Sequence, residues 1–217
     1  MQKKLHENHR QRQKEKFRKG QLAPHEHVEL MLYYPLKRIN TNEIAHELMN
    51  DLGGIKGIFC SDEERLMQIK GVGADTALFI RNIAEIMRLY ELQNCHIEEL
   101  LSSEYELYKF LNALFVGACN ECVYMLSFSE KGKLIAYDKL SDGFFGKAVI
   151  MTRAAVKQAM KAGAASVIIA HNHPDGICIP SNTDKLSAEK LTDAFASAGI
   201  AVRAHYVVAD GKCVEIL

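Results

Sequence analysis

A-H-N-H-P-D-G-I-C-I-P-S-N-T-D, residues 170–184, is the stretch around which the second half of the chain is organised. The apolar run at residues 166–170 just before it predicts a buried strand. A strand that ends in His-x-His places His171 and His173 on the same side, because side chains alternate along a strand. Asp184 follows eleven residues after His173. Two imidazoles and one carboxylate are the protein ligands of a catalytic zinc site, whose fourth position stays open for water. We therefore expect these three side chains to bind Zn²⁺.

Two further residues are candidates for the chemistry of such a site. Ser181 is a suitable N-cap for a helix beginning at Thr183, and its hydroxyl is also placed to donate to an oxyanion on the substrate, since it lies one helical turn from Asp184. A hydrolytic zinc site also needs a base that accepts the proton of the attacking water. Glu121 is the best upstream candidate, because it leads into the apolar segment 122–128. By local sequence alone, a solvated strand end is the better explanation of Glu121.

The composition is that of a globular protein with no net charge. The chain has 217 residues, of which 48% are hydrophobic, and its 27 basic residues balance 27 acidic ones. No apolar run approaches the ~20 residues that span a bilayer, so no membrane association is expected. The basic N-terminus lacks the apolar segment of a signal peptide. The six scattered cysteines are therefore expected to be reduced thiols in a cytoplasmic protein.

The pattern along the chain predicts four segments. Residues 1–23 form a basic arm, in which the first twenty positions hold eight Lys or Arg and two Glu, an excess of six positive charges. Such an arm is either a solvated helix or a segment that contacts nucleic-acid phosphate. Residues 24–93 have helical periodicity, 94–103 resemble a linker, and 104–217 form an α/β domain.

A glycine turn stands out in the helical segment. Gly71 and Gly73 lie between a short helix and a long one, which resembles a helix-hairpin-helix motif. Backbone amides at such a turn can contact a DNA phosphate without reading sequence. A tight turn with no ligand is the structural alternative, and it is favoured by Asp75, whose carboxylate would repel phosphate. Residues 1–93 are thus a possible DNA-binding region.

The α/β domain is predicted to contain a mixed sheet, built mostly from hairpins and flanked by helices. Alternating or continuous apolar runs predict its strands, and capped amphipathic segments predict its helices. Thr152 is the expected cap of the second helix. The predicted strands are 122–128, 134–140, 143–151, 166–170, 200–209 and 214–217, and the predicted helices are 104–115, 153–162 and 183–198.

The motif H-N-H-P-x-G-x₃-P-S-x₂-D at residues 171–184 resembles the RadC family, a bacterial branch of the JAMM (MPN-plus) metalloproteases. Residues 120–124 are similar to the strand that supplies the JAMM glutamate, and residues 140–143 resemble the leucine-serine-x-glycine turn of the family. The resemblance covers nearly the whole chain. It implies a cytidine-deaminase-like, MPN-type mixed-sheet domain after an all-helical N-terminal region with helix-hairpin-helix elements.

For function, the resemblance implies zinc held by His171, His173 and Asp184, with Glu121 as general base and Ser181 assisting the oxyanion. Family members of known activity cleave peptide or isopeptide bonds, so an unidentified protein or peptide is the expected substrate. Two alternatives stay open: a DNA-associated repair or recombination accessory protein with a structural or inactive metal domain, and a metal-dependent nuclease that uses the same ligands. Cys178, between the histidines and Asp184, is expected to be a loop residue rather than a further ligand.

Overall fold

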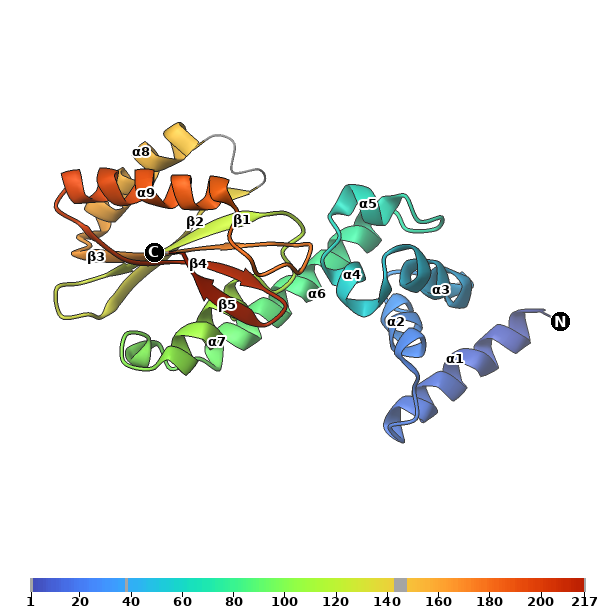
Figure 1. Ribbon diagram of the computed structural model, residues 1–217. Coiled ribbons are helices and arrows are strands. Elements are labelled where there is room, and N and C mark those ends of the chain that lie inside the picture. The colour runs from blue at the N-terminus through green and yellow to red at the C-terminus, as the bar shows by residue number, and fades with distance from the viewer. Residues whose placement is uncertain (1, 38, 143–147, 217) are drawn as a thin grey trace. The chain divides into compact units, whose positions relative to one another are not determined.

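The computed structural model describes residues 2–37, 39–142 and 148–216 (Figure 1). The chain divides into two compact units, Met1–Met87 and Arg88–Leu217. The division lies within helix α6, Ala74–Gln93, upstream of the segment 94–103 that was expected to be a linker. That segment contains a short 3₁₀ helix, Ile97–Glu99, and it buries Cys95 and Leu100 in the core of the second unit. It therefore packs as part of that unit.

The first unit is helical, as the periodicity predicts. Its helices before α6 are α1 (Gln2–Arg18), α2 (Pro24–Leu32), α3 (Thr41–Asp51), α4 (Gly54–Phe59) and α5 (Glu63–Met67). Leucine and isoleucine side chains from α2 to α6 form its core, including Leu32, Leu48, Ile58, Leu66 and Ile80. Burial of these side chains, at about 25 cal/mol per Å² of apolar surface, holds short helices together that would be marginal alone.

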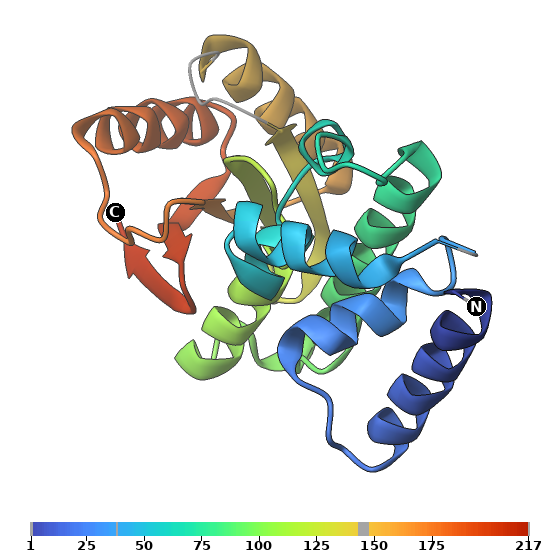
Figure 2. The same cartoon turned by 90° about the vertical axis from the view of Figure 1, so that its right-hand side faces the viewer.

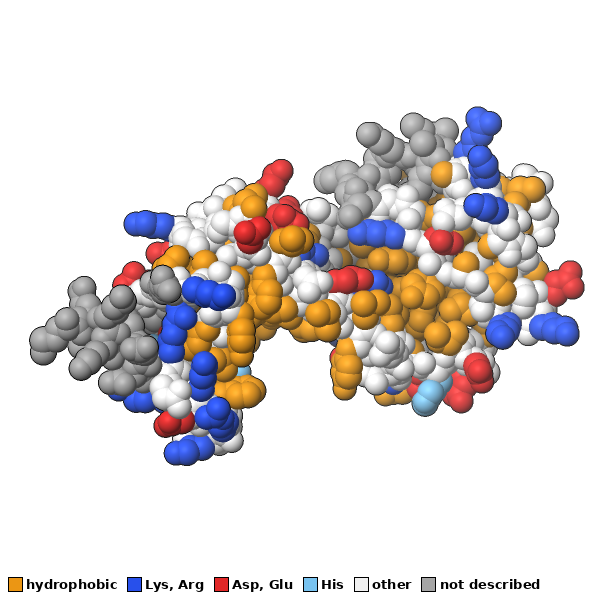
Figure 3. All heavy atoms as spheres, turned by 180° about the vertical axis from the view of Figure 1, so that it is seen from behind, with side chains coloured by type: hydrophobic (Ala, Val, Ile, Leu, Met, Phe, Trp, Pro, Cys, Tyr) orange, Lys and Arg blue, Asp and Glu red, His pale blue; other side chains and the backbone are white. Residues whose placement is uncertain are grey.

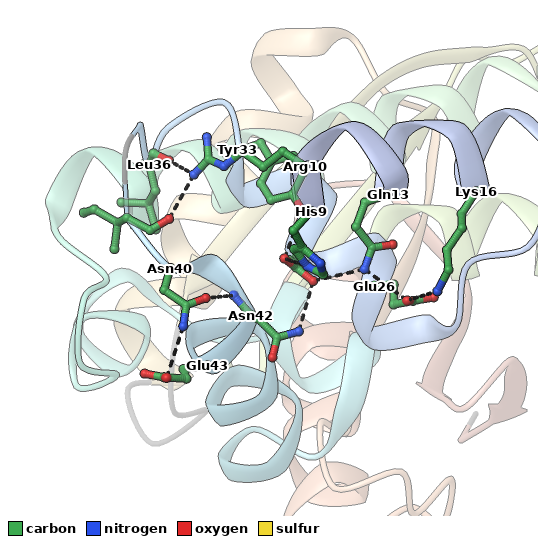
Figure 4. A network of polar contacts seen from close by, with 12 residues as sticks. His9, Arg10, Gln13, Lys16, Glu26, Tyr33, Leu36, Asn40, Asn42 and Glu43 are labelled. Carbon is green, nitrogen blue, oxygen red and sulfur yellow. Dashed lines mark hydrogen bonds and ion pairs between the residues drawn. The ribbon is translucent and has the colours of Figure 1, made fainter. Parts of the chain in front are cut away.

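Helix α1 lies beside α2 (Figure 2), and a network of polar contacts joins the two helices (Figure 4). At its centre is a buried carboxylate, that of Glu29. The Glu29 side chain is almost fully buried and lies 2.9 Å from His9 Nε2. It accepts hydrogen bonds from the Tyr33 hydroxyl at 2.9 Å and the Asn42 amide at 3.1 Å. The Gln13 amide donates to it at 3.4 Å. A buried carboxylate is tolerated when it is paired and hydrogen-bonded in this way.

Two cations of the basic arm are also used inside the first unit. Lys16 Nζ lies 2.6 Å from Glu26 Oε1. Arg10 donates to the backbone oxygens of Leu36 and Ile39, both at 3.0 Å, and its guanidinium lies over the Tyr33 ring. These contacts give Arg10 and Lys16 a structural role that needs no nucleic acid.

The Glu26 contacts predict a pH dependence of stability. The hydrogen bond from Lys16, followed by that from the Ala23 N–H, lowers the pKa of Glu26 from 4.5 to about 2, against the opposing effect of burial. Because the folded-state pKa is the lower one, this stabilisation is present above about pH 4.5 and is lost as the pH falls toward 2. Urea unfolding at a series of pH values should therefore show a shallower acid loss in Glu26→Gln than in the parent protein.

Glu15→Gln is the matched control, since Glu15 is exposed on α1 and its carboxylate accepts only a surface hydrogen bond from Gln11 among the described contacts of its side chain. Equal acid dependence in the two variants would contradict the role assigned to Glu26.

The second unit is a five-stranded mixed sheet in the order β2-β1-β3-β4-β5. Strand β3 pairs antiparallel with β1 and parallel with β4, while β2 and β5 join the edges in antiparallel fashion. Helix α7 packs on one face, and α8 and α9 pack on the other (Figure 1). The elements are α7 (Glu104–Leu114), β1 (Cys122–Phe128), β2 (Leu134–Asp142), α8 (Ala148–Ala162), β3 (Ser166–Asn172), α9 (Asn182–Ser197), β4 (Ala201–Ala209) and β5 (Lys212–Glu215).

Most predicted elements of this unit are confirmed, and two predictions were wrong. Residues 148–151, expected as an extended segment, begin α8, so Thr152 lies inside the helix rather than capping it. A short apolar run does not distinguish a strand from a buried helix. The residues 143–147 of the same prediction lie outside the described part of the chain. Strand β5 begins two residues earlier than the predicted 214–217, because Asp210 and Gly211, at φ 45° and 76°, make a tight two-residue hairpin.

Strand β2 lies at an edge of the sheet, and its exposed side chains include Ile135 and Tyr137. Figure 3 shows hydrophobic side chains gathered on the surface of this unit.

Within the described ranges, no helix is long and apolar enough to cross a membrane.

Candidate metal centre

The candidate site lies at the end of β3, the central strand. His171 pairs in register with Val123 of β1 and Val207 of β4, and its side chain is fully buried. His173 follows directly after the strand, where its backbone N–H donates to Val208 O at 3.0 Å. Asp184, in the first turn of α9, is also buried. The chain thus brings together the three side chains that the sequence predicts as ligands.

The donor atoms of these residues have the spacing of a tetrahedral site. The Nε2 atoms of His171 and His173 are 3.2 Å apart. Asp184 Oδ1 lies 3.7 Å from His171 Nε2, and Asp184 Oδ2 lies 3.5 Å from His173 Nε2. In a tetrahedral zinc site with bonds of about 2.0–2.1 Å, neighbouring ligand atoms are about 3.3–3.4 Å apart. Among the described residues, these three are the one group of His, Cys and acidic side chains close enough to share an ion. The group can therefore bind a metal.

Two of these side chains are oriented by backbone partners in the adjoining loop. His173 Nδ1 lies 2.7 Å from Ile177 O, so it donates a proton there and leaves Nε2 as the ligand nitrogen. The Ser181 N–H donates to Asp184 Oδ2 at 2.7 Å. The loop between β3 and α9 thus fixes the geometry of both residues.

The protonation states also suit a metal. Burial lowers the pKa of His171 to about 4, with the charge of Asp184 opposing this shift and that of His173 adding to it. For Asp184, burial raises the pKa, but hydrogen bonds from Ser181 and the nearby histidines outweigh it, so the pKa of this carboxyl is lowered overall. At neutral pH His171 is neutral and Asp184 is ionised, as metal binding requires.

Ser181 caps α9, as the sequence predicts. Its hydroxyl oxygen accepts from Asp184 N at 3.1 Å, and together with the reverse bond to the carboxylate this forms a capping box. The side chain is exposed beside the group, so its hydroxyl proton can reach a bound molecule.

Glu121 lies on the same side of the sheet as the two histidines. Val123 pairs with His171, and extending this antiparallel register by two residues places Glu121 opposite His173. Burial raises the pKa of the half-buried Glu121 carboxyl, with the charges of Asp184 and Asp175 adding to the effect and that of His173 opposing it. The structure thus brings the predicted base within electrostatic reach of the ligand group.

Sequence reasoning missed Asn172, the middle residue of the His-Asn-His motif. Its side chain points to the other face of the sheet and is buried. The amide oxygen accepts from Cys122 N at 2.8 Å, and the amide nitrogen donates to Asn120 O at 3.2 Å. Asn172 therefore holds the backbone on both sides of Glu121. A polar residue at an apolar-facing strand position was the signal that could have found it.

A second buried histidine, His205 of β4, was also given no role from the sequence. Its Nε2 lies 3.1 Å from His171 Nδ1, and burial lowers its pKa to about 3. Nothing in the local sequence marks it, because β3 and β4 are joined by a whole helix and only their parallel pairing brings the two residues together.

The glycines proposed for DNA contact lie elsewhere, on the α5–α6 turn of the first unit. Gly71 has φ 91°, and a Cβ atom there would lie 2.8 Å from Ile44 Cδ1. Conformation and packing explain this glycine without a ligand. Around Gly73 there is open space, and DNA contact by either residue stays a prediction.

Cys178 donates to Val207 O and Lys212 O and lies outside the ligand group.

Comparison with known proteins assigns the family. The sequence model of the RadC-like JAB domain matches residues 101–216, more than half of the chain. The chain belongs to the RadC-like JAB domain family. A UPF0758 protein of Vibrio cholerae serotype O1 is 29% identical over 177 residues, covering 82% of this chain and 79% of that protein. A UPF0758 protein of Aliivibrio fischeri is 26% identical over 194 residues, covering 89% and 87%. The family match includes every residue of the ligand group, Glu121 and Ser181.

We predict one metal ion per chain, bound by the three-residue group of this RadC-like domain. His173→Ala and Asp184→Ala should each lower metal affinity by more than about 100-fold, because losing a ligand costs more than losing a group that only orients one. Metal content after dialysis, measured by elemental mass spectrometry, tests this. Asp193→Ala is the control, since Asp193 is exposed further along α9. Equal metal content in all four proteins would refute the assignment.

Proposed function

We propose that this protein is a zinc-dependent hydrolase that cleaves a peptide or isopeptide bond. The observation that carries the proposal is the convergence of His171, His173 and Asp184 at tetrahedral spacing, with Glu121, just before β1, within electrostatic reach of the group. Two neutral imidazoles and one carboxylate leave a position open for water, which is the arrangement of catalytic rather than structural zinc sites.

Each residue has a role that follows from its position. A bound zinc ion would supply Lewis acidity, lowering the pKa of a water molecule and polarising the substrate carbonyl. Glu121 would take the proton from the attacking water and deliver it to the leaving amine. A carboxyl with a raised pKa suits both steps, because general acid–base catalysis is most efficient when the pKa approaches the working pH.

Ser181 would assist by donating its hydroxyl proton to the oxyanion that develops on the substrate carbonyl. Its oxygen accepts the Asp184 N–H, which fixes the side chain while leaving its own proton available. A donor held in place before the reaction stabilises developing charge without reorganising. The family resemblance favours an amide bond over a phosphodiester, and this separates the proposal from a nuclease with the same ligands.

Glu121→Gln tests the base. This substitution should keep the bound metal, because Glu121 is outside the ligand group, and should lower hydrolysis of peptide or isopeptide substrates by about 10²–10⁴-fold. The assay is mass spectrometry of a peptide and isopeptide library, with single- and double-stranded DNA as comparison substrates. Glu130→Gln, at the exposed β1–β2 turn, is the matched control. The proposal fails if Glu121→Gln is as active as the control, or if the protein cleaves DNA but no amide.

A further inference from the structure

His205 lies behind the ligand group, on the side away from where a metal would sit. It occupies the middle of β4, and only 1% of its surface is exposed. Its ring meets that of His171 edge-on, with centroids 5.2 Å apart and planes at 86°. His205 Nε2 lies 3.1 Å from His171 Nδ1, a hydrogen-bond distance between the two nitrogens.

The atoms at this contact fix which nitrogen carries each proton. His171 faces His173 and Asp184 with Nε2, so Nε2 must keep its lone pair to bind a metal. A neutral imidazole then carries its proton on Nδ1, which becomes a donor. His205 Nε2 is the nitrogen at hydrogen-bond distance and must accept this proton. With a metal on His171 Nε2, His205 would therefore be neutral and carry its own proton on Nδ1.

The partner of His171 differs from those of the other two residues. His173 and Asp184 are oriented by backbone groups of the adjoining loop, namely Ile177 O and the Ser181 N–H. His171 is oriented by a side chain 34 residues away in sequence. The sheet fixes that side chain, because His205 pairs in register with Ile169 and its backbone oxygen accepts from Ile216 N at 2.7 Å.

We propose that His205 is a positioning residue for the metal centre, which sets the ring orientation and the tautomer of His171 by accepting its Nδ1 proton. The inference rests on the proposed metal site and adds a residue to it. A ligand histidine is more often oriented by a carboxylate or a carbonyl oxygen. A neutral imidazole orients the ring without adding negative charge, so a metal held here keeps more of its positive charge for the substrate.

Metal affinity of the full-length protein tests this role without any substrate. Zn²⁺ and Co²⁺ dissociation constants are measured by chelator competition in the parent protein, His205→Leu and His205→Gln. His205→Leu removes the acceptor and should weaken binding by about 10–100-fold. His205→Gln offers a carbonyl oxygen in its place and should recover most of that loss, with Co²⁺ absorption bands like those of the parent. A role limited to filling space predicts no such recovery.

The matched control is Val202→Ala, near the start of β4 and packed against the core under α8 and α9, which should lower stability without changing metal affinity. If the parent protein binds metal and His205→Leu binds it equally well, the role of His205 is overturned while the proposed function stands. If the parent protein binds no metal, both are overturned.

If His205→Leu does not fold, the imidazole tautomers of the zinc-loaded parent protein test the role of His205 instead. Long-range ¹H–¹⁵N correlation of the imidazoles should show protons on His171 Nδ1 and His205 Nδ1. A proton on His205 Nε2 would overturn the proposal.

Discussion

The pairing of β3 between β1 and β4 is the constraint on which the site depends. Its antiparallel register with β1 sets Val123 opposite His171 and so brings Glu121, two residues earlier, to the side of the two histidines. Its parallel register with β4 sets His205 against His171. A slip of one residue on either side would turn the slipped side chains to the α7 face. The register is strongly specified, because both faces of β3 are buried. The hydrophobic cores on the two faces thus determine where the chemistry lies.

Burying the side chains of His171, His205 and Asp184 costs free energy that the rest of the fold has to offset. Burial lowers the pKa of His171 to about 4 and that of His205 to about 3. Both pKa values lie below the ~6.5 of an exposed histidine. As the pH falls from ~6.5 toward these folded-state values, the unfolded chain therefore binds more protons than the folded one. Without metal, acid therefore destabilises the domain. A bound cation would attract the Asp184 carboxylate and hold both ligand histidines neutral, so it would offset this cost.

Local sequence was sufficient for the residues whose roles depend on short spacing. His171 and His173 share one strand, and Ser181 and Asp184 share one helical turn, so alternation and capping rules predicted both pairs. Glu121 needed the family resemblance, because nothing local separates it from a solvated strand end. His205 and Asn172 depend on pairing between strands, and periodicity within a single segment does not give the partner of a strand.

The same difference between local pattern and long-range packing explains the wrong secondary-structure predictions. Residues 148–151 are apolar in a way that suits either a strand or a buried helix, and only the packing of Ala155 and Ala159 against the sheet decides for the helix. The shift of β5 follows from the two positive φ angles at Asp210 and Gly211. Local sequence likewise does not give the packing of Gly71 against Ile44, and a phosphate contact at this turn stays a prediction.

A crystal structure of the zinc-loaded protein, with anomalous diffraction measured on both sides of the zinc absorption edge, tests the central claim most directly. The account predicts one anomalous peak within about 2.0–2.2 Å of His171 Nε2, His173 Nε2 and an Asp184 oxygen, with the Glu121 carboxylate facing its open side. A peak bound by other residues, or no peak at this group while zinc is present in the crystal, would contradict it.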